Sequence, residues 1–264
     1  MKIKDVISTL ERFAPLPLQE DYDNAGLQVG LTEAEVSGVL LCLDVTEQVV
    51  SEAQQLGCNM IVSHHPLIFR KLRHISCATY VERCVMQAIR SGITIVSMHT
   101  NLDSAEGGVN YEIAHRLGID MQTVTILQPR EVEGVTGGSC IVGELPQPLT
   151  ADAYINKVKE VFHVPCVMGN ELLQRPIKRI AICGGAGAFM LPQAVDAQAD
   201  AFLTGEMHYH EYFAHEQEIQ ITIIGHYESE QYTQHLLKEI IDKGCPGVRT
   251  VITSVNTNPV RHYF

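Results

Sequence analysis

Histidines and acidic residues that follow apolar runs carry the clearest chemistry in this sequence. His64 and His65 come directly after the apolar run 60–62 and precede Pro66. Neighbouring side chains on a strand point to opposite faces, so two ligands here require the chain to leave strand geometry. Pro66 promotes that departure because it has no N–H and disfavours helix at the residue before it. Alone, a His-His pair is typical of a hydrogen-bonded surface turn.

Two further histidines follow predicted strands, and each has a carboxylate four residues later. They are His99 with Asp103 and His226 with Glu230. Ligands of open α/β sheets bind at the carboxyl ends of the parallel strands, which is where we expect these residues. Imidazole and carboxylate groups suit divalent iron, zinc, manganese, cobalt or nickel.

The size of this set favours two metal ions over one. Three histidines and two carboxylates exceed the four ligands of a tetrahedral zinc, whereas two ions that share a carboxylate or a water would use them all. We therefore predict a two-metal site with these ligands: His64, His65, Asp103, His226 and Glu230. A hydroxide held between such ions is a strong nucleophile near neutral pH.

The distance between His226 and Glu230 depends on where the last helix begins. Residues four apart are neighbours on a helix face, so a helix that starts before Glu230 brings the two together. Ser229 is also a suitable N-cap, and a helix that starts there would leave the distance undetermined. The sequence leaves both alternatives open.

The elements that carry these residues alternate between short β-branched runs and amphipathic helical stretches. Such alternation predicts an α/β fold with mostly parallel sheets flanked by helices. The predicted strands span 39–45, 59–65, 94–99, 179–185, 200–206 and 221–226, and the helices lie near 1–17, 46–56, 80–91, 150–162, 189–197, 208–217 and 229–243. Glycines that follow helical runs predict left-handed C-caps at Gly57, Gly92, Gly118 and Gly244. The glycine- and proline-bounded segment 125–148 predicts a hairpin or an edge strand.

The two halves of the chain repeat one pattern. Leu40-Leu41-Cys42 aligns with Ala181-Ile182-Cys183, and residues 59–63 align with residues 200–204 at the same offset. The His99/Asp103 and His226/Glu230 pairs extend the match. We infer an internal duplication into two related α/β halves with the metal site in the cleft between them. The predicted domains are residues 1–124 with 226–264, and residues 125–225.

Composition restricts the classes of partner. A net charge of −12 and a pI near 5.4 provide no broad positive field for nucleic acid as the main partner. The sequence has no run of 18 apolar residues and no signal-peptide core, so we expect a cytoplasmic protein without a membrane partner. The eight cysteines form no C-x-x-C pair, which predicts buried or bystander thiols rather than disulfides or a cysteine-rich zinc site.

Six motifs occur in order along the whole chain: DNAGLQVG at 23–30, SHHP at 63–66, HTNLD at 99–103, CGGAG at 183–187, TGEMHYH at 204–210 and GHYESE at 225–230. Together they resemble those of the dinuclear-metal-centre, Nif-three-like family of GTP cyclohydrolase type 2 homologues. The resemblance implies a toroidal homohexamer whose metal pairs face an internal cavity, the five ligands given above, and a supporting role for His99. The length fits members without an inserted middle domain. Ala186 stands where many relatives have serine.

The resemblance also implies a metal-dependent hydrolase of the GTP cyclohydrolase type. In that reaction metal-bound hydroxide attacks C8 of the purine of a small, nucleotide-like substrate, and candidates for proton transfer are Glu206, His208 and His210. A metal-dependent phosphoesterase fits the same ion pair. The alternative from another class is a metal-binding hexameric scaffold or regulator without turnover.

Other stretches match catalytic motifs only in part. Gly184-Gly185-Ala186-Gly187 has Met190 where G-x-G-x-x-G needs its last glycine, which favours a tight turn between strand and helix. His210 and His215 are one residue too far apart for H-E-x-x-H, so we interpret them as solvated helix residues, with His208 and His210 as groups that border the site. The sequence contains neither a Walker-type G-K-S/T nor a G-x-S-x-G elbow.

Overall fold

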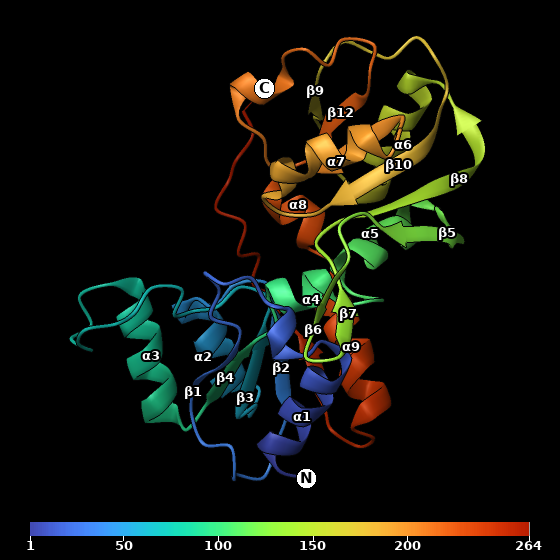
Figure 1. Cartoon of the computed structure of the whole chain (residues 1–264). Helices are drawn as coiled ribbons and strands as arrows, with labels where there is room; N and C mark the ends of the chain where they lie inside the picture. Colours follow the sequence, from blue (N-terminus) through green and yellow to red (C-terminus); the bar gives the residue numbers. More distant parts are fainter. Residues whose placement is uncertain (264) are drawn as a thin grey trace. The chain divides into compact units, whose positions relative to one another are not determined.

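The computed structural model describes residues 1–263, which form two compact α/β units (Figure 1). Unit 1 comprises Met1–Leu102 and the chain from Thr233 onward, and unit 2 comprises Asp103–Tyr232. The chain therefore passes from one unit to the other twice, at 102–103 and at 232–233. Within the described residues no helix has both the length and the apolar character needed to cross a membrane.

Unit 1 is built on a five-stranded sheet in the order β1-β4-β3-β2-β13. Four strands are parallel, and β1 is antiparallel to β4. The strands are β1 (Gly26–Val29), β2 (Val39–Cys42), β3 (Met60–Ser63), β4 (Thr94–Ser97) and β13 (Thr250–Ile252). Every residue of β2, β3 and β4 is buried, as expected for parallel strands covered on both faces.

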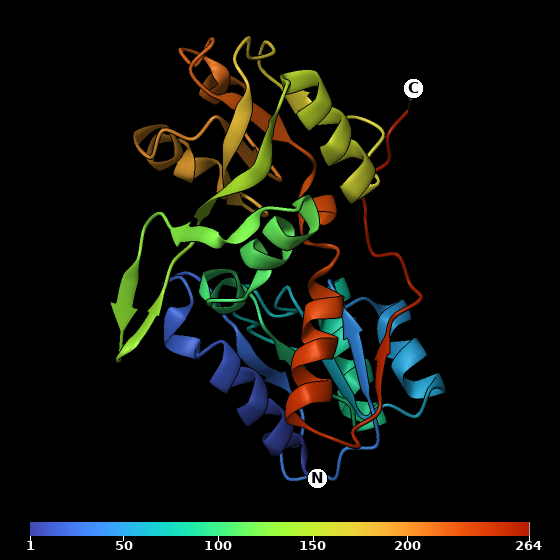
Figure 2. The same ribbon diagram turned by 90° about the vertical axis from the view of Figure 1, so that its right-hand side faces the viewer.

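Helices cover both faces of this sheet (Figure 2). One face packs against α2 (Glu47–Gln55) and α3 (Tyr80–Ser91) and the other against α9 (Thr233–Gly244), which lies beside α1 (Ile3–Phe13). The short η1 (Leu16–Leu18) follows α1. Thr46 and Thr79 accept backbone N–H groups at the starts of α2 and α3, and Gly92 ends α3 in the left-handed conformation, as the sequence predicted.

Unit 2 contains a six-stranded mixed sheet in the order β5-β8-β10-β11-β12-β9 and a separate β6–β7 hairpin. The strands are β5 (Asp120–Ile126), β6 (Arg130–Val132), β7 (Val135–Gly137), β8 (Ile141–Leu149), β9 (Met168–Gly169), β10 (Ile177–Cys183), β11 (Ala201–Thr204) and β12 (Gln220–Ile223). Only β10, β11 and β12 are mutually parallel. The hairpin and β8 account for the segment predicted at 125–148.

Helices of unit 2 also lie on both faces of its sheet. One face carries α5 (Val109–Leu117) and α6 (Ala151–Phe162), and the other carries η2 (Gly187–Met190) and α7 (Leu191–Asp196). The unit also contains η3 (Tyr209–Tyr212) and α8 (His226–Glu230). The short α4 (Thr100–Ser104) contains the passage from unit 1 into unit 2.

The two sheets share one internal order. In unit 1, β2-β3-β4 are parallel neighbours with antiparallel β1 beyond β4, and in unit 2, β10-β11-β12 are parallel neighbours with antiparallel β9 beyond β12. Cys42 pairs with Ser63 as Cys183 pairs with Thr204. The residues aligned in the sequence repeat thus hold the same register, which supports the proposed duplication.

The structure corrects several details predicted from the sequence. Residues 103–124 group with unit 2 because α5 and β5 pack against β8 and β10, and α8 groups with it because it contacts α5. The helix predicted near 208–217 is the single turn η3 followed by turns. Gly244 is the last residue of α9 and has no positive φ, whereas Gly57 and Gly118 do.

Candidate metal centre

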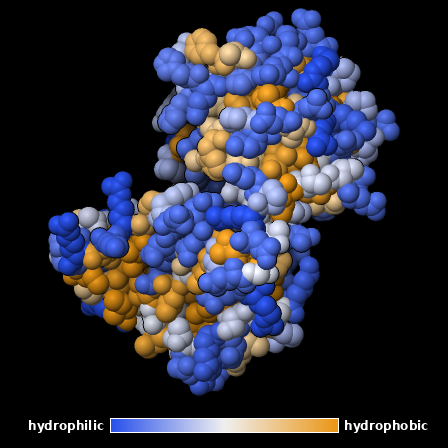
Figure 3. Space-filling model, viewed as in Figure 1, coloured by the Kyte–Doolittle hydropathy of each residue, from blue (hydrophilic) through white to orange (hydrophobic). Residues whose placement is uncertain are grey.

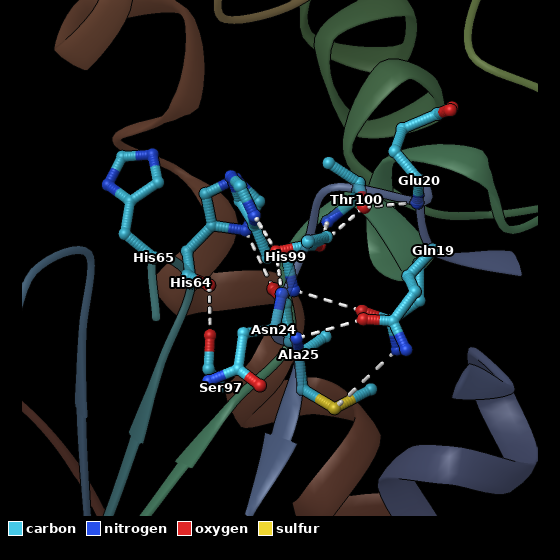
Figure 4. A network of polar contacts seen from close by, with 12 residues as sticks. Gln19, Glu20, Asn24, Ala25, His64, His65, Ser97, His99 and Thr100 are labelled. Carbon is cyan, nitrogen blue, oxygen red and sulfur yellow. Dashed lines mark hydrogen bonds and ion pairs between the residues drawn. The ribbon is translucent and has the colours of Figure 1, made fainter. Parts of the chain in front are cut away.

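Three imidazoles of unit 1 gather where β3 and β4 end (Figure 4). His64 and His65 follow β3 at a bend, and His99 follows β4. The ring centroids lie 4.9 Å apart for His64–His65 and 5.4 Å apart for both His64–His99 and His65–His99. One nitrogen from each ring lies within 4.8 Å of the others, so this histidine cluster could hold a metal ion. The predicted departure from strand geometry at His64 and His65 is confirmed.

Each imidazole of the cluster donates its Nδ1–H to an acceptor in the same unit. His64 bonds to the Met98 carbonyl at 2.8 Å. His65 bonds to Asp44 at 2.8 Å, and His99 bonds to Asp23 at 2.7 Å. These bonds fix the tautomer and ring orientation, so a metal would be bound through Nε2. Histidines that bind metals almost always have such a partner on the other nitrogen.

Hydroxyl groups at the strand ends hold the histidine backbone in place. Ser97 donates from Oγ to the His64 carbonyl at 2.7 Å, as Figure 4 shows. Ser63 donates from Oγ to the His65 carbonyl at 2.8 Å. Both serines are buried, so the bend that separates His64 from His65 is fixed from inside the sheet.

The two carboxylates behind the cluster are held in the ionised form. Burial disfavours the charge on Asp23, but the hydrogen bond and charge of His99 and the hydrogen bond from Thr100 outweigh it and lower its pKa to about 2. Burial also opposes ionisation of Asp44, but hydrogen bonds from His65 and Thr257 lower its pKa. Ionised carboxylates at these places make the imidazoles stronger electron donors.

A second constellation lies in unit 2 on the short helix α8. The helix begins at His226 after Gly225, whose φ of 103° suits glycine. His226 Nε2 lies 3.2 Å from Glu230 Oε2, as expected for residues four apart on a helix. The alternative in which Ser229 caps the helix is therefore wrong. His226 donates its Nδ1–H to Glu206 at 3.0 Å, which repeats the arrangement found in unit 1.

The loop after β10 supports this helix. The Gly185 N–H donates to Ser229 Oγ at 3.0 Å, and Ser229 Oγ donates to the His226 carbonyl at 2.8 Å. The Gly185 carbonyl accepts N–H groups of Gly205 and Glu206 at 3.0 and 3.1 Å. Gly185 has a φ of 59°, and a Cβ here would overlap Glu230 Oε1. The glycine-rich turn therefore allows the Glu230 carboxylate to lie against the backbone.

Asp103 is tied to the same loop through Asn110. Asn110 donates to the Asp103 carbonyl at 3.1 Å and accepts the Gly184 N–H at 2.9 Å. The thiol of Cys183 has a pKa well above its usual value because of a hydrogen bond with Cys140, its burial, and the negative charges of Asp103 and Glu230. Unit 2 thus places both predicted carboxylate ligands near the end of β10.

The three predicted candidates for proton transfer have different surroundings in the structure. Glu206 lies behind His226 as its hydrogen-bond partner, whereas His208 caps η3 and His210 stacks on Phe213 with ring centroids 6.0 Å apart. The sequence analysis missed Asp44, although a carboxylate directly after the predicted strand 39–45 was a usable signal. Its partner His65 follows the neighbouring strand, β3, and only the strand order reveals that the two segments are adjacent.

The fold and these side chains define a class of protein, an α/β chain with histidine and carboxylate groups suited to divalent metals at its strand ends. Residues 1–259 match the Duf34/NIF3 (NGG1p interacting factor 3) family, and the chain belongs to it. This confirms the family that the ordered motifs predicted.

Named relatives and solved structures agree with this membership. The GTP cyclohydrolase 1 type 2 homolog of Clostridium acetobutylicum is 34% identical over 234 residues, which cover 87% of this chain and 85% of that protein. The Helicobacter pylori protein named GTP cyclohydrolase 1 type 2 is 30% identical, with 90% and 91% covered. A Staphylococcus aureus crystal structure is 27% identical and matches with a TM-score of 0.89, covering 100% of this chain and 99% of that one. A Bacillus cereus protein related to NIF3 has the same fold, with a TM-score of 0.88 at 24% identity over 100% and 99% of the two chains.

Proposed function

We propose that this protein is a dinuclear metal-dependent hydrolase of the GTP cyclohydrolase type. The observation that carries the proposal is the set of anchored imidazoles: four histidines donate Nδ1–H to a carboxylate or a backbone carbonyl, which leaves Nε2 as the nitrogen that could bind a metal. Such bonds are typical of histidines that bind metals. A hydrolytic role agrees with the names of the curated relatives.

The proposed ligands come from both units. Unit 1 supplies His64 and His65, and unit 2 supplies Asp103, His226 and Glu230. Asp103 is the first residue of unit 2, and Glu230 lies two residues before Tyr232, the last one. Both proposed carboxylate ligands are therefore close in sequence to a passage from one unit to the other. His99 lies beside His64 and His65 and bonds to Asp23, which suits a positioning role.

The donor set fits divalent iron, zinc, manganese, cobalt or nickel, because it combines imidazole nitrogens with carboxylate oxygens and uses no thiolate. Bound ions of this kind supply Lewis acidity, which lowers the pKa of water and polarises oxygen atoms of a substrate. Glu206 lies within hydrogen-bond distance of His226 and is 58% exposed, which supports a proposed role in proton exchange with a substrate as well as in orienting the ring. We propose a purine nucleotide as substrate: one water adds at C8 and opens the imidazole ring to a formamide, and a second water hydrolyses the formamide C–N bond, which releases formate and leaves a free amine. We also propose that six copies of the chain assemble into the ring that the family resemblance implies.

Metal-depleted protein reconstituted with manganese, iron or zinc tests the proposal. We expect formate release from GTP with at least one metal, and loss of both metal binding and turnover in His64→Ala and Glu230→Ala. His74→Ala is the matched control, because this histidine is 71% exposed and lies outside the cluster.

Other outcomes of the same assay would overturn the assignment. Cleavage of phosphoesters in place of GTP would make the protein a metal-dependent phosphoesterase. Stoichiometric metal binding without turnover of either substrate, in protein whose ring is intact by analytical ultracentrifugation, would make it a metal-binding scaffold. A crystal without anomalous peaks at the Nε2 atoms of His64 and His226 after metal soaking would contradict the metal centre itself.

A further inference from the structure

Exposed hydrophobic side chains interrupt the hydrophilic surface of both units (Figure 3). In unit 2 several of them line one cavity of about 570 Å³ between β9 and η3. This aromatic pocket has walls of three ring side chains, Tyr209, Tyr212 and Phe213, and two thioethers, Met168 and Met207. Its volume lies within the range of small-molecule sites.

Two of the rings contact each other edge to face. The centroids of Tyr209 and Phe213 lie 5.4 Å apart with their planes at 74°. Their faces carry the negative part of the ring quadrupole, which attracts cations and planar cationic groups. His210 stacks on Phe213 at 29° and holds that ring in place.

The charges around the aromatic pocket favour the same kind of ligand. Two carboxylates, Glu171 and Glu216, line it, and none of the described residues that line it carries a positive charge. The chain as a whole has a net charge of −12, which attracts cations over a longer range. Anionic ligands, including nucleotide phosphates, would therefore be repelled.

Hydrogen bonds hold the segments that form the walls of the pocket. Asn170 donates from Nδ2 to the carbonyls of His215 and Ile219 at 3.1 and 2.8 Å and accepts the Ile221 N–H at 2.9 Å. On the other side the His208 N–H donates to Glu211 at 2.6 Å, which caps η3. A pocket whose walls are fixed in advance loses little entropy when a ligand enters it.

We propose that the aromatic pocket binds a flat aromatic cation, such as a pyridinium or an N-alkylated heterocyclic base. None of the residues that line the pocket is a proposed metal ligand, and the inference does not depend on the proposed hydrolase activity. The ligand ring lies against Tyr209 and Phe213, and its positive charge faces Glu171 and Glu216.

Two probes that differ by one methyl group test the charge requirement. 1-Methylnicotinamide is a permanent cation, and nicotinamide is its neutral counterpart. We expect the cation to bind about 10-fold more tightly in titration calorimetry, the size of a partly desolvated cation–π contribution. Phe213→Ala should weaken the cation about 10-fold, and the isosteric Glu171→Gln/Glu216→Gln double variant should remove the preference for the cation.

Phe189→Ala is the matched control, since Phe189 is 57% exposed in the same unit and does not line the pocket. It should leave the affinity of 1-methylnicotinamide unchanged. Equal binding of the two probes, no binding at millimolar concentration, or cation binding that survives both Phe213→Ala and the double Gln variant would overturn the proposal. Because Phe213 is 55% exposed, its variant should retain the wild-type unfolding transition.

Discussion

At the scale of single residues, the carboxylates behind the imidazoles set the orientation and basicity of side chains that could hold a metal ion. Asp44 is the clearest case, because it joins two segments far apart in the chain. It accepts the Nδ1–H of His65 at 2.8 Å on one oxygen and the hydroxyl of Thr257 at 2.9 Å on the other. An ionised Asp44 both orients His65 and raises its basicity.

Asp44→Asn should therefore weaken metal binding while the fold is retained. The amide can accept one hydrogen bond from His65 but carries no charge, and loss of such a partner costs about 10- to 100-fold in metal affinity. Competition with a chromophoric chelator measures the change. Asp21→Asn removes an exposed carboxylate of the same unit and should have no effect. If the two variants bind metal equally well, Asp44 has no role in the centre.

Sequence reasoning found the proposed ligands because they share a local signal. Each imidazole follows an apolar run, and the carboxylates follow imidazoles at one spacing. The anchoring residues lack such a signal, because Asp23 reaches His99 across 76 positions and Asp44 reaches His65 across 21. These contacts depend on which strands are neighbours. The order of the strands in the sheet cannot be read directly from the sequence.

At the scale of elements, the loop after β10 determines the position of Glu230. Gly185 is required there for two reasons, a positive φ and the close approach of Glu230 Oε1. The sequence analysis interpreted this run as a tight turn, and the structure adds its contact with α8. The break between α8 and α9 is a comparable detail: a single helix was predicted at 229–243, yet the chain forms two.

Gly185→Ala should displace Glu230 and lower metal affinity at least 10-fold, the cost of disturbing a ligand or its support. Gly134→Ala is the matched control, because Gly134 has a φ of 79° with nothing within 4 Å of an added Cβ. Both variants pay for an unfavourable backbone conformation, about 1 kcal/mol. Only the methyl group added in Gly185→Ala would overlap a carboxylate, that of Glu230. Equal metal affinity in the two proteins would show that Glu230 is not a ligand.

The start of α3 provides a pH-dependent element outside the candidate centre. Glu82 accepts the Ser76 N–H and Oγ–H at 2.8 and 2.7 Å and the Ala78 N–H at 3.1 Å. The Ser76 side-chain and backbone hydrogen bonds and the one from Ala78 lower its pKa from 4.5 to about 2. A depressed carboxyl pKa stabilises the folded state above the unfolded pKa, and the stabilisation is lost as the pH falls toward the folded pKa.

Glu82→Gln should therefore destabilise the protein at pH 7, and the difference from wild type should shrink between pH 4.5 and about 2. Urea unfolding at several pH values, with the variant and wild type compared at each, isolates this residue from other acid effects. Glu239→Gln on α9 changes an exposed carboxylate and should show no such trend. If the difference in unfolding free energy between wild type and Glu82→Gln does not change with pH, the Glu82 carboxylate is not the source of the pH dependence.

At the scale of the whole molecule, the sequence predicted two related α/β units but not their limits. The repeat was visible because buried parallel strands draw on few residue types at regular spacing. The boundaries at 102–103 and 232–233 could not be predicted from the sequence. The sequence of α5 does not indicate which of the two sheets the helix packs against. Only its packing against β8 and β10 does so.

A ligand set drawn from both units predicts that metal stabilises both of them. A metal at 100 times its dissociation constant should add about 2.7 kcal/mol to the free energy of unfolding. The chain has no tryptophan, so Tyr80→Trp in unit 1 and Phe189→Trp in unit 2, both at exposed positions, give one fluorescent reporter for each unit. Metal should raise the urea midpoint at both reporters.

The informative step is to add Glu230→Ala, a change in unit 2, to each reporter protein. If the ions need ligands from both units, this variant removes the metal-dependent shift at the unit 1 reporter as well, although no unit 1 residue has changed. The His74→Ala control should keep both shifts. A unit 1 reporter that still responds fully to metal would mean that His64, His65 and His99 bind an ion without help from unit 2, and the dinuclear centre would then be wrong.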